Sequence, residues 1–192
     1  MTKARLTSAG KNENASTSAA ADPRKHTGGS SSEQGETTIP LPGSMAPDFV
    51  LEDERGVDRR LSEFRGSPVV LYFYPADDTP GCTKEACNFR DDYSMYTKAG
   101  VVVLGISPDS ALSHAKFKSK YSLPFTLLAD PGHVVCSKYG VWGEKQFMGR
   151  TFDGVLRTTF LIDSTGRIMR VFEKVRPAQH SAEIIAELRA LA

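Results

Sequence analysis

Short apolar runs and helical periods alternate along the chain after residue 44. Residues 69–74 and 101–106 are continuous apolar runs of about the usual strand length, 5–6 residues, as expected of strands that are covered on both faces. Between them, apolar residues recur at steps of three and four, which predicts a helix over residues 82–98. The positions that set this period are Ala86, Phe89, Tyr93 and Tyr96.

The remaining pattern completes an alternation of strands and helices. A hairpin with a glycine turn is predicted within residues 49–60, and further strands at 125–128, 157–163 and 168–172. Helices are predicted from Asp109, as the cap, to residue 121, and over 131–139 and 181–191. This order predicts an α/β fold in which a central mixed β-sheet is flanked by helices and preceded by an N-terminal β-hairpin.

The first 43 residues differ in composition from the rest. They contain no Phe, Trp or Tyr and are rich in Ser, Thr, Gly, Ala and Asn, so they cannot bury enough apolar surface to offset their ordering entropy. We therefore expect a disordered tail over residues 1–43 and one domain over residues 44–192. The tail has no apolar signal-peptide core. An organelle or nuclear address is the alternative to a plain tail.

Charge and cysteine content limit which partners, compartment and type of site we expect. The 192 residues carry a formal net charge of +1, so we expect neither a nucleic acid nor a membrane as partner. No apolar run approaches the roughly 20 residues of a membrane span. Three cysteines are too few for a secreted disulfide scaffold, which favours a reducing compartment, the cytoplasm, and a catalytic or metal-binding cysteine pair.

Cys82 occupies the most informative position in the sequence. It follows a predicted buried strand and opens a predicted helix, where backbone N–H groups and the helix dipole favour a reactive thiolate. Pro80 and Gly81 provide a tight turn, and the Thr79 hydroxyl is placed to reach the sulfur or an incoming oxygen.

Cys87 lies five residues after Cys82. Five steps of a regular α-helix separate two Cα atoms by roughly 8–9 Å, whereas a disulfide requires less than about 7 Å. The two cysteines therefore either never pair, or pair only when the start of the helix unwinds. A sulfenic acid on Cys82 would drive the pairing, because it condenses with a thiol.

These residues resemble the peroxiredoxin active-site motif, Pro-x3-Thr-x2-Cys with Glu three residues later. A second cysteine five residues on is the pattern of the atypical two-cysteine peroxiredoxin Q group, also called bacterioferritin comigratory proteins. The resemblance covers about residues 40–192. Its further segments are 73–75, 103–107, 125–130, 139–145 and 157–163.

The resemblance implies a thioredoxin-like fold and a thiol-specific peroxidase that acts on hydrogen peroxide and organic hydroperoxides. It implies thioredoxin or a similar dithiol protein as reductant, no cofactor or metal, and, since both cysteines share a chain, a monomer. By position, Cys82 matches the peroxidatic cysteine and Cys87 the resolving cysteine. The other motif positions are Pro75 and Thr79, which shape the pocket, Arg157, which contacts the sulfur, and Glu85, which orients that arginine.

Some of these residues would also fit other kinds of protein. A zinc site would use Cys82, Cys87, His133 and Cys136, but this spacing is loose. A cysteine hydrolase needs a histidine base, and we expect the four histidines to have surface or capping roles. A binding module without turnover would not need the cysteine pair. We expect Cys136 to be a packing residue, and Trp142 and Phe147 to lie in a loop at a pocket rim or partner surface.

Overall fold

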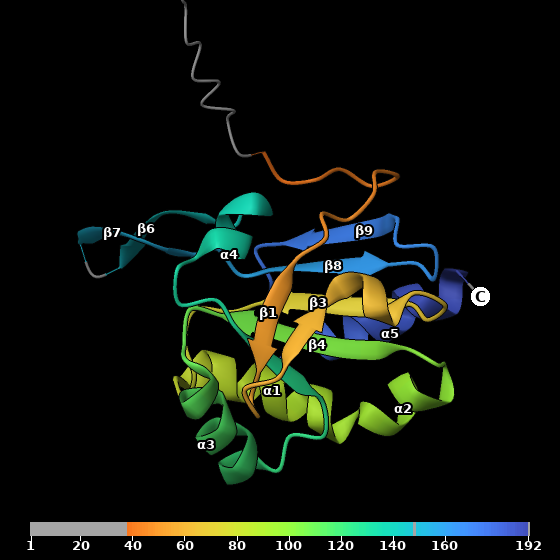
Figure 1. Cartoon of the computed structure of the whole chain (residues 1–192), viewed down its shortest axis with the longest axis horizontal. Coiled ribbons are helices and arrows are strands. Elements are labelled where there is room, and N and C mark those ends of the chain that lie inside the picture. The colour runs from red at the N-terminus through yellow and green to blue at the C-terminus, as the bar shows by residue number, and fades with distance from the viewer. Residues whose placement is uncertain (1–37, 148, 192) are drawn as a thin grey trace, which may run out of the picture. The chain divides into compact units, whose positions relative to one another are not determined.

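Seven strands form one mixed sheet at the centre of the molecule in a computed structural model that describes residues 38–147 and 149–191 (Figure 1). The strand order is β2-β1-β5-β4-β3-β8-β9, in which β3, β4 and β5 run parallel and the other pairs run antiparallel. The strands are β1 (Val50–Asp53), β2 (Asp58–Arg60), β3 (Val69–Phe73), β4 (Val102–Ser107), β5 (Thr126–Ala129), β8 (Thr158–Ile162) and β9 (Ile168–Glu173). The predicted mixed sheet and the hairpin β1–β2 are confirmed.

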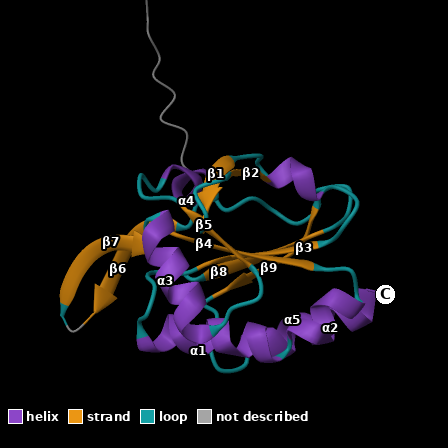
Figure 2. Cartoon of the chain, turned by 60° about the horizontal axis from the view of Figure 1, so that its bottom comes forward, coloured by secondary structure: helices purple, strands orange, loops and turns teal. Residues whose placement is uncertain are grey.

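Helices cover the sheet on both faces (Figure 2). One face carries α1 (Pro80–Asp91), α2 (Tyr93–Lys98), α3 (Ala111–Tyr121) and α5 (His180–Leu191), and the other carries the 3-10 helix η1 (Leu61–Phe64) and α4 (Val134–Lys138). Side chains of β3 alternate between the two resulting cores: Leu71 and Phe73 enter one, and Val70 and Tyr72 the other. All five residues of β3 are buried, as a strand covered on both faces requires.

Two predicted helix boundaries are wrong. The helix predicted over residues 82–98 begins at Pro80 and is interrupted at Asp92, which separates α1 from α2. The Asp92 side chain accepts a hydrogen bond from Ser181 Oγ at 2.7 Å, a tertiary contact that no local period reveals. Ser110, rather than Asp109, caps α3, because Asp109 instead accepts the backbone N–H of Asp77 at 2.8 Å.

The segment that we expected to be a glycine-rich loop is a second, two-stranded sheet. β6 (Trp142–Phe147) and β7 (Arg150–Val155) pair antiparallel and extend away from the main sheet (Figure 1). The hairpin leads directly into Arg157, which precedes β8, so it positions one of the predicted site residues.

The N-terminal part of the described chain packs on the domain ahead of the predicted boundary at residue 44. Ile39 packs against the core that contains α4, and the Gly43 N–H donates to the Ile168 carbonyl at 2.7 Å. The tail predicted over residues 1–43 otherwise lies outside the described residues, up to residue 37. In the described part of the chain, no helix has the length and apolar character needed to span a membrane.

Candidate active site

Cys82 lies in the first turn of α1, at the end of the connection from β3. Thr79 is the N-cap, Pro80 is the first helical residue, and the first intrahelical hydrogen bond runs from Thr83 N–H to the Thr79 carbonyl at 2.8 Å. The N–H groups of Gly81 and Cys82 precede that bond, so they belong to the electropositive end of the helix. The Cys82 side chain is buried, with 2% of the residue exposed.

Arg157 joins Cys82 to Glu85. Its Nη2 donates to Cys82 Sγ at 3.2 Å, and its Nη1 donates to Glu85 Oε2. Glu85 lies three residues after Cys82 on α1, whereas Arg157 lies just before β8, whose first residue, Thr158, pairs with Phe73 at the end of β3. The structure therefore brings together three of the predicted site residues. Arg157 lies 72 positions after Glu85 and 75 positions after Cys82 in the sequence.

Burial and the neighbouring charges act in opposite directions on Glu85 and on Arg157. Burial raises the pKa of Glu85 to about 7, against the opposing attraction of the Arg157 guanidinium. Burial alone would lower the pKa of Arg157, but the charges of Glu85 and Cys82 raise it above the ordinary arginine value. Glu85 Oε1 has no hydrogen-bond partner among the described residues. The guanidinium is thus a permanently charged donor fixed beside the sulfur.

Thr79 and Pro75 lie on the same connection and are both partly buried. The Thr79 hydroxyl donates to the Ala76 carbonyl at 3.0 Å, so its proton is not free for the sulfur, which was one of its two expected partners, the other being an incoming oxygen. The lone pairs of the Thr79 hydroxyl remain available to accept a hydrogen bond from an incoming hydroperoxide. Pro75 follows the last residues of the β3 run and starts the turn toward Thr79.

Cys87 lies on the same helix, partly buried, and is a free thiol, as are Cys82 and Cys136. α1 is continuous from residue 80 to residue 91, so the five helical steps between Cys82 and Cys87 hold their Cα atoms roughly 8–9 Å apart. This spacing is too long for a disulfide. The pair is therefore reduced and separated in this conformation.

A buried polar network that the sequence did not reveal anchors the β3–α1 connection. Asp77 accepts hydrogen bonds from Tyr74 Oη at 2.7 Å and Ser113 Oγ at 2.8 Å, and contacts His114 Nδ1 at 2.9 Å. The other ring nitrogen of His114 faces the Leu128 carbonyl at 3.1 Å. These contacts fix the connection to α3 and β5. The signal available in the sequence was only an Asp five residues before the cysteine.

The positions of the histidines and of Cys136 bear on the two alternative sites, a zinc site and the site of a cysteine hydrolase. Surface or capping roles were expected for the histidines. His114 and His180 are fully buried, so a surface role is wrong for these two, and their rings are hydrogen-bonded to the Leu128 carbonyl and to Thr159, respectively. Cys136 is buried in the core on the opposite face of the sheet from Cys82. The two thiols therefore cannot share a zinc ion, and the described residues include no cluster of three or more potential metal ligands.

Cys136 is suited to packing and not to redox chemistry. It is 0% exposed, and burial, together with the nearby Asp130, raises the pKa of its thiol. We therefore expect Cys136 to react poorly with peroxide, because the thiolate is the reactive form.

The β6–β7 hairpin lies next to Arg157 in the chain, and its Lys145 is close enough to feel the charge of that arginine. Lys145 Nζ donates to the Val155 carbonyl at 2.7 Å, and burial lowers the pKa of Lys145, with Arg157 acting in the same direction. Leu156, next to Arg157, is 36% exposed. Trp142 stacks on His133, with ring centroids 4.0 Å apart, so it is a packed residue of the hairpin base. The Phe147 side chain, also expected at the rim, lies outside the described part.

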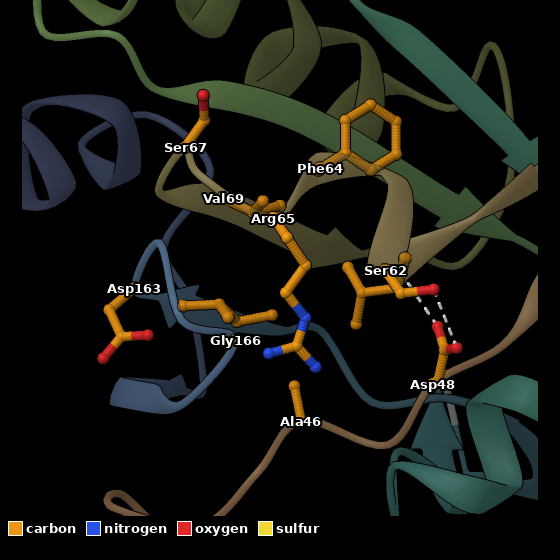
Figure 3. A pocket seen from close by; sticks show the side chains of 11 residues that line it. Ala46, Asp48, Ser62, Phe64, Arg65, Ser67, Val69, Asp163 and Gly166 are labelled. Atoms are coloured by element: carbon orange, nitrogen blue, oxygen red, sulfur yellow. Dashed lines mark hydrogen bonds between the residues drawn. The ribbon is translucent and has the colours of Figure 1, made fainter.

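A small pocket at the other end of β3 does not belong to this site (Figure 3). Val69, at the start of β3, lines it, together with Phe64, Arg65 and Gly166. The Arg65 side chain extends toward Gly166, where an added Cβ would lie 2.4 Å from its Nη1. None of the predicted site residues lines this pocket, so we assign it no catalytic role.

A mixed sheet with a buried cysteine at the start of the helix after its central strand, contacted by an arginine, defines a thiol-dependent peroxidase of thioredoxin-like fold. Comparison with known proteins gives the family. The chain belongs to the AhpC/TSA family, whose model matches residues 42–171, and within it to the Bcp, or Q, group of peroxiredoxins.

Two relatives illustrate the match. A putative peroxiredoxin Bcp of Coxiella burnetii is 53% identical over 146 residues, which are 76% of this chain and 97% of the relative. Peroxiredoxin Bcp of Escherichia coli is 46% identical over 147 residues, 77% of this chain and 94% of the relative.

Solved structures agree with the sequence relatives. A Xanthomonas campestris bacterioferritin comigratory protein, described for its alkyl peroxide reduction activity, superposes with a TM-score of 0.72 at 33% identity, covering 81% of this chain and 98% of that chain. A variant of Xylella fastidiosa PrxQ gives a TM-score of 0.76 at 30% identity, with 80% and 98% covered. The predicted thioredoxin-like fold and peroxidase class are confirmed.

Proposed function

We propose that Cys82 is the peroxidatic cysteine of this peroxidase and that Cys87 resolves it within the same chain. The observation that carries the first role is the 3.2 Å contact between Arg157 Nη2 and Cys82 Sγ at the start of α1. A cation and a helix N-terminus both favour the thiolate. The same guanidinium is placed to donate to the peroxide oxygens, where negative charge develops as the O–O bond breaks.

In the proposed first step, the Cys82 thiolate attacks the terminal oxygen of a hydroperoxide. An S–O bond forms, the O–O bond breaks, and the departing oxide takes a proton to leave as water or alcohol. The product is a Cys82 sulfenic acid. Thr79 supports this step through the lone pairs that its bond to the Ala76 carbonyl leaves free, and Pro75 shields the pocket. Glu85 holds the guanidinium in place.

In the proposed second step, the first turns of α1 unwind and the Cys87 sulfur displaces hydroxide from Cys82. The need for unwinding follows from the helical spacing of roughly 8–9 Å. Burial of Cys82 at 2% exposure adds to this argument, because the sulfur must leave its pocket to meet Cys87. A thioredoxin-type dithiol protein then reduces the disulfide through a mixed disulfide.

The substrates of this proposal are hydrogen peroxide and organic hydroperoxides. The apolar side chain of Leu156, the chain neighbour of Arg157, is 36% exposed and supports the acceptance of an alkyl group. Because both cysteines lie on one helix, catalysis needs no second subunit, and we expect a monomer that requires no cofactor, nucleic acid or membrane. Three free thiols fit a reducing compartment such as the cytoplasm.

Peroxide consumption coupled to a thioredoxin system tests the two roles. Cys82→Ser should be inactive. Cys87→Ser should consume about one peroxide per chain and then stall as the sulfenic acid. Retained turnover in Cys82→Ser would refute the first assignment, and multiple turnovers in Cys87→Ser would refute the second.

A further inference from the structure

The last turn of α1 is tied to the residues that precede α5. The two helices pack side by side (Figure 2). Asn88, the chain neighbour of Cys87, is half-buried, and its side-chain amide donates to the Pro177 carbonyl and to the Ala178 carbonyl, each at 3.0 Å. Both carbonyls belong to the turn that opens into α5, so one side chain fastens α1 to this turn.

A second tie lies one helical turn further on. Ser181 Oγ donates to Asp92 Oδ2 at 2.7 Å, and Tyr96 Oη donates to the Ser181 carbonyl at 3.1 Å. Asp92 is the residue that ends α1, and its N–H donates to the Asn88 carbonyl at 3.0 Å. The end of α1 is therefore held to α5 at two neighbouring positions, Asn88 and Asp92.

The start of α1 meets the same connection in a different way. A Cβ built on Gly81 would lie 3.8 Å from Cγ of Pro177, so the proline ring lies beside the first turn of the helix. Such a contact between a ring and a glycine contributes little by itself, whereas side-chain hydrogen bonds hold the last turn. Local opening occurs first where stabilisation is least. We therefore expect α1 to open from its start and to stay closed from Asn88 onward.

The extent of this opening determines which cysteine moves. If it stops before Asn88, Cys87 keeps its place and Cys82 alone has to travel. Two groups react faster when one of them is held in position, because less orientational freedom is lost on the way to the bonding geometry. If the last turn opened as well, both cysteines would lie on a loose segment. The sulfenic acid would then persist and could react with a second peroxide to give a sulfinic acid.

We propose that Asn88 is a positioning residue for the second step, which stops the opening of α1 and holds Cys87 where the sulfenic acid of Cys82 arrives. In this step the S–S bond forms as the S–O bond of the sulfenic acid breaks. The Cys82 sulfur is reduced and the Cys87 sulfur is oxidised. The thiol proton of Cys87 and the departing hydroxide leave as water. The inference rests on the resolving role proposed for Cys87.

The first test locates the end of the opening by hydrogen exchange at the Asp92 N–H, followed by NMR in the reduced and disulfide forms of the full chain. In the wild type, protection of this N–H should change by less than about threefold on oxidation. In the disulfide form of Asn88→Ala it should be about tenfold lower than in the wild type, as expected for the loss of two hydrogen bonds between neutral groups. Alanine favours a helix more than asparagine does, so helix propensity would change the protection in the opposite direction.

The second test follows a single turnover by rapid quench. Asn88→Ala should form the Cys82 sulfenic acid at the parental rate, convert it to disulfide about three- to tenfold more slowly, and accumulate more sulfinic acid in excess hydrogen peroxide. A residue that merely stabilises the intact helix predicts the opposite sign, because a looser helix would open more often and speed the disulfide. Lys84→Ala, at an exposed position of the same helix, is the control and should stay within about twofold of the parental rates.

A third variant keeps the test decisive if Asn88→Ala fails to fold. Ser181→Ala removes the second tie and should also slow disulfide formation. The proposal would be overturned if oxidation of the wild type abolished protection at the Asp92 N–H, or if Asn88→Ala or Ser181→Ala formed the disulfide at the parental rate or faster. Failure of the underlying proposal looks different, because the wild type itself would then form no disulfide between Cys82 and Cys87.

Discussion

We expect the buried carboxyl of Glu85 to contribute stability that this peroxidase loses as the pH rises. Its pKa is raised from an ordinary value of 4.5 to about 7 in the folded chain. Between these values the folded state binds a proton that the unfolded state has released, so stability is full below the unfolded value and is lost as the pH approaches and passes 7. At about 1.4 kcal/mol per unit of pKa difference, the total loss is on the order of 3 kcal/mol.

The substitution that isolates this effect is Glu85→Gln, which keeps the shape and removes the titration. We expect urea unfolding of the reduced protein to show that the wild type loses about 2–3 kcal/mol relative to Glu85→Gln between pH 5 and pH 8. Glu52→Gln, on an exposed position of β1, is the control and should track the wild type. The reasoning would be refuted if the difference in unfolding free energy between the wild type and Glu85→Gln stayed constant from pH 5 to pH 8. That result would mean that Arg157 keeps Glu85 ionised throughout.

Three other substitutions probe the site and its support. Arg157→Lys should slow sulfenic acid formation by about 10²-fold in stopped-flow assays, because a single ammonium cannot replace the donor fork that contacts both Cys82 and Glu85; a loss under threefold would contradict this. Gly105→Ala should cost about 1–3 kcal/mol in chemical unfolding, since its Cβ would lie 2.6 Å from the Tyr72 ring, and unchanged stability would show that the ring moves freely. Cys136→Ser should keep normal peroxidase turnover, and lost turnover would show that this buried thiol takes part in the cycle.

Local patterns predicted the elements whose apolar period is strong. The buried strands β3 and β4 and the helix that contains Ala86 and Phe89 lie within a few residues of their predicted positions. The β6–β7 hairpin was missed because its sequence shows no alternation with a buried face. Its strands carry Gly143 and Gly154, which directly oppose each other, and glycine in a strand gives the appearance of a loop.

The site was only partly accessible to local reasoning. Its position in the sequence identified Cys82 as a thiol at the start of a helix. The five-residue spacing showed that Cys82 and Cys87 cannot form a disulfide while that helix is intact. Arg157 lies 75 residues from Cys82, and its contact depends on how β8 pairs with β3, so only the family resemblance pointed to it. The contacts of Asp77 and Asp92 could not be predicted for the same reason, because their partners lie on α3 and α5, far away in the sequence.

The measurement that tests the redox pair most directly is a non-reducing tryptic map after one equivalent of hydrogen peroxide. Cleavage after Arg65, Lys84 and Arg90 separates the cysteines into peptides 66–84 and 85–90. The account predicts that these two peptides are recovered as a disulfide-linked pair from monomeric protein. Recovery of Cys82 linked to Cys136, or to a second copy of the chain, would contradict it.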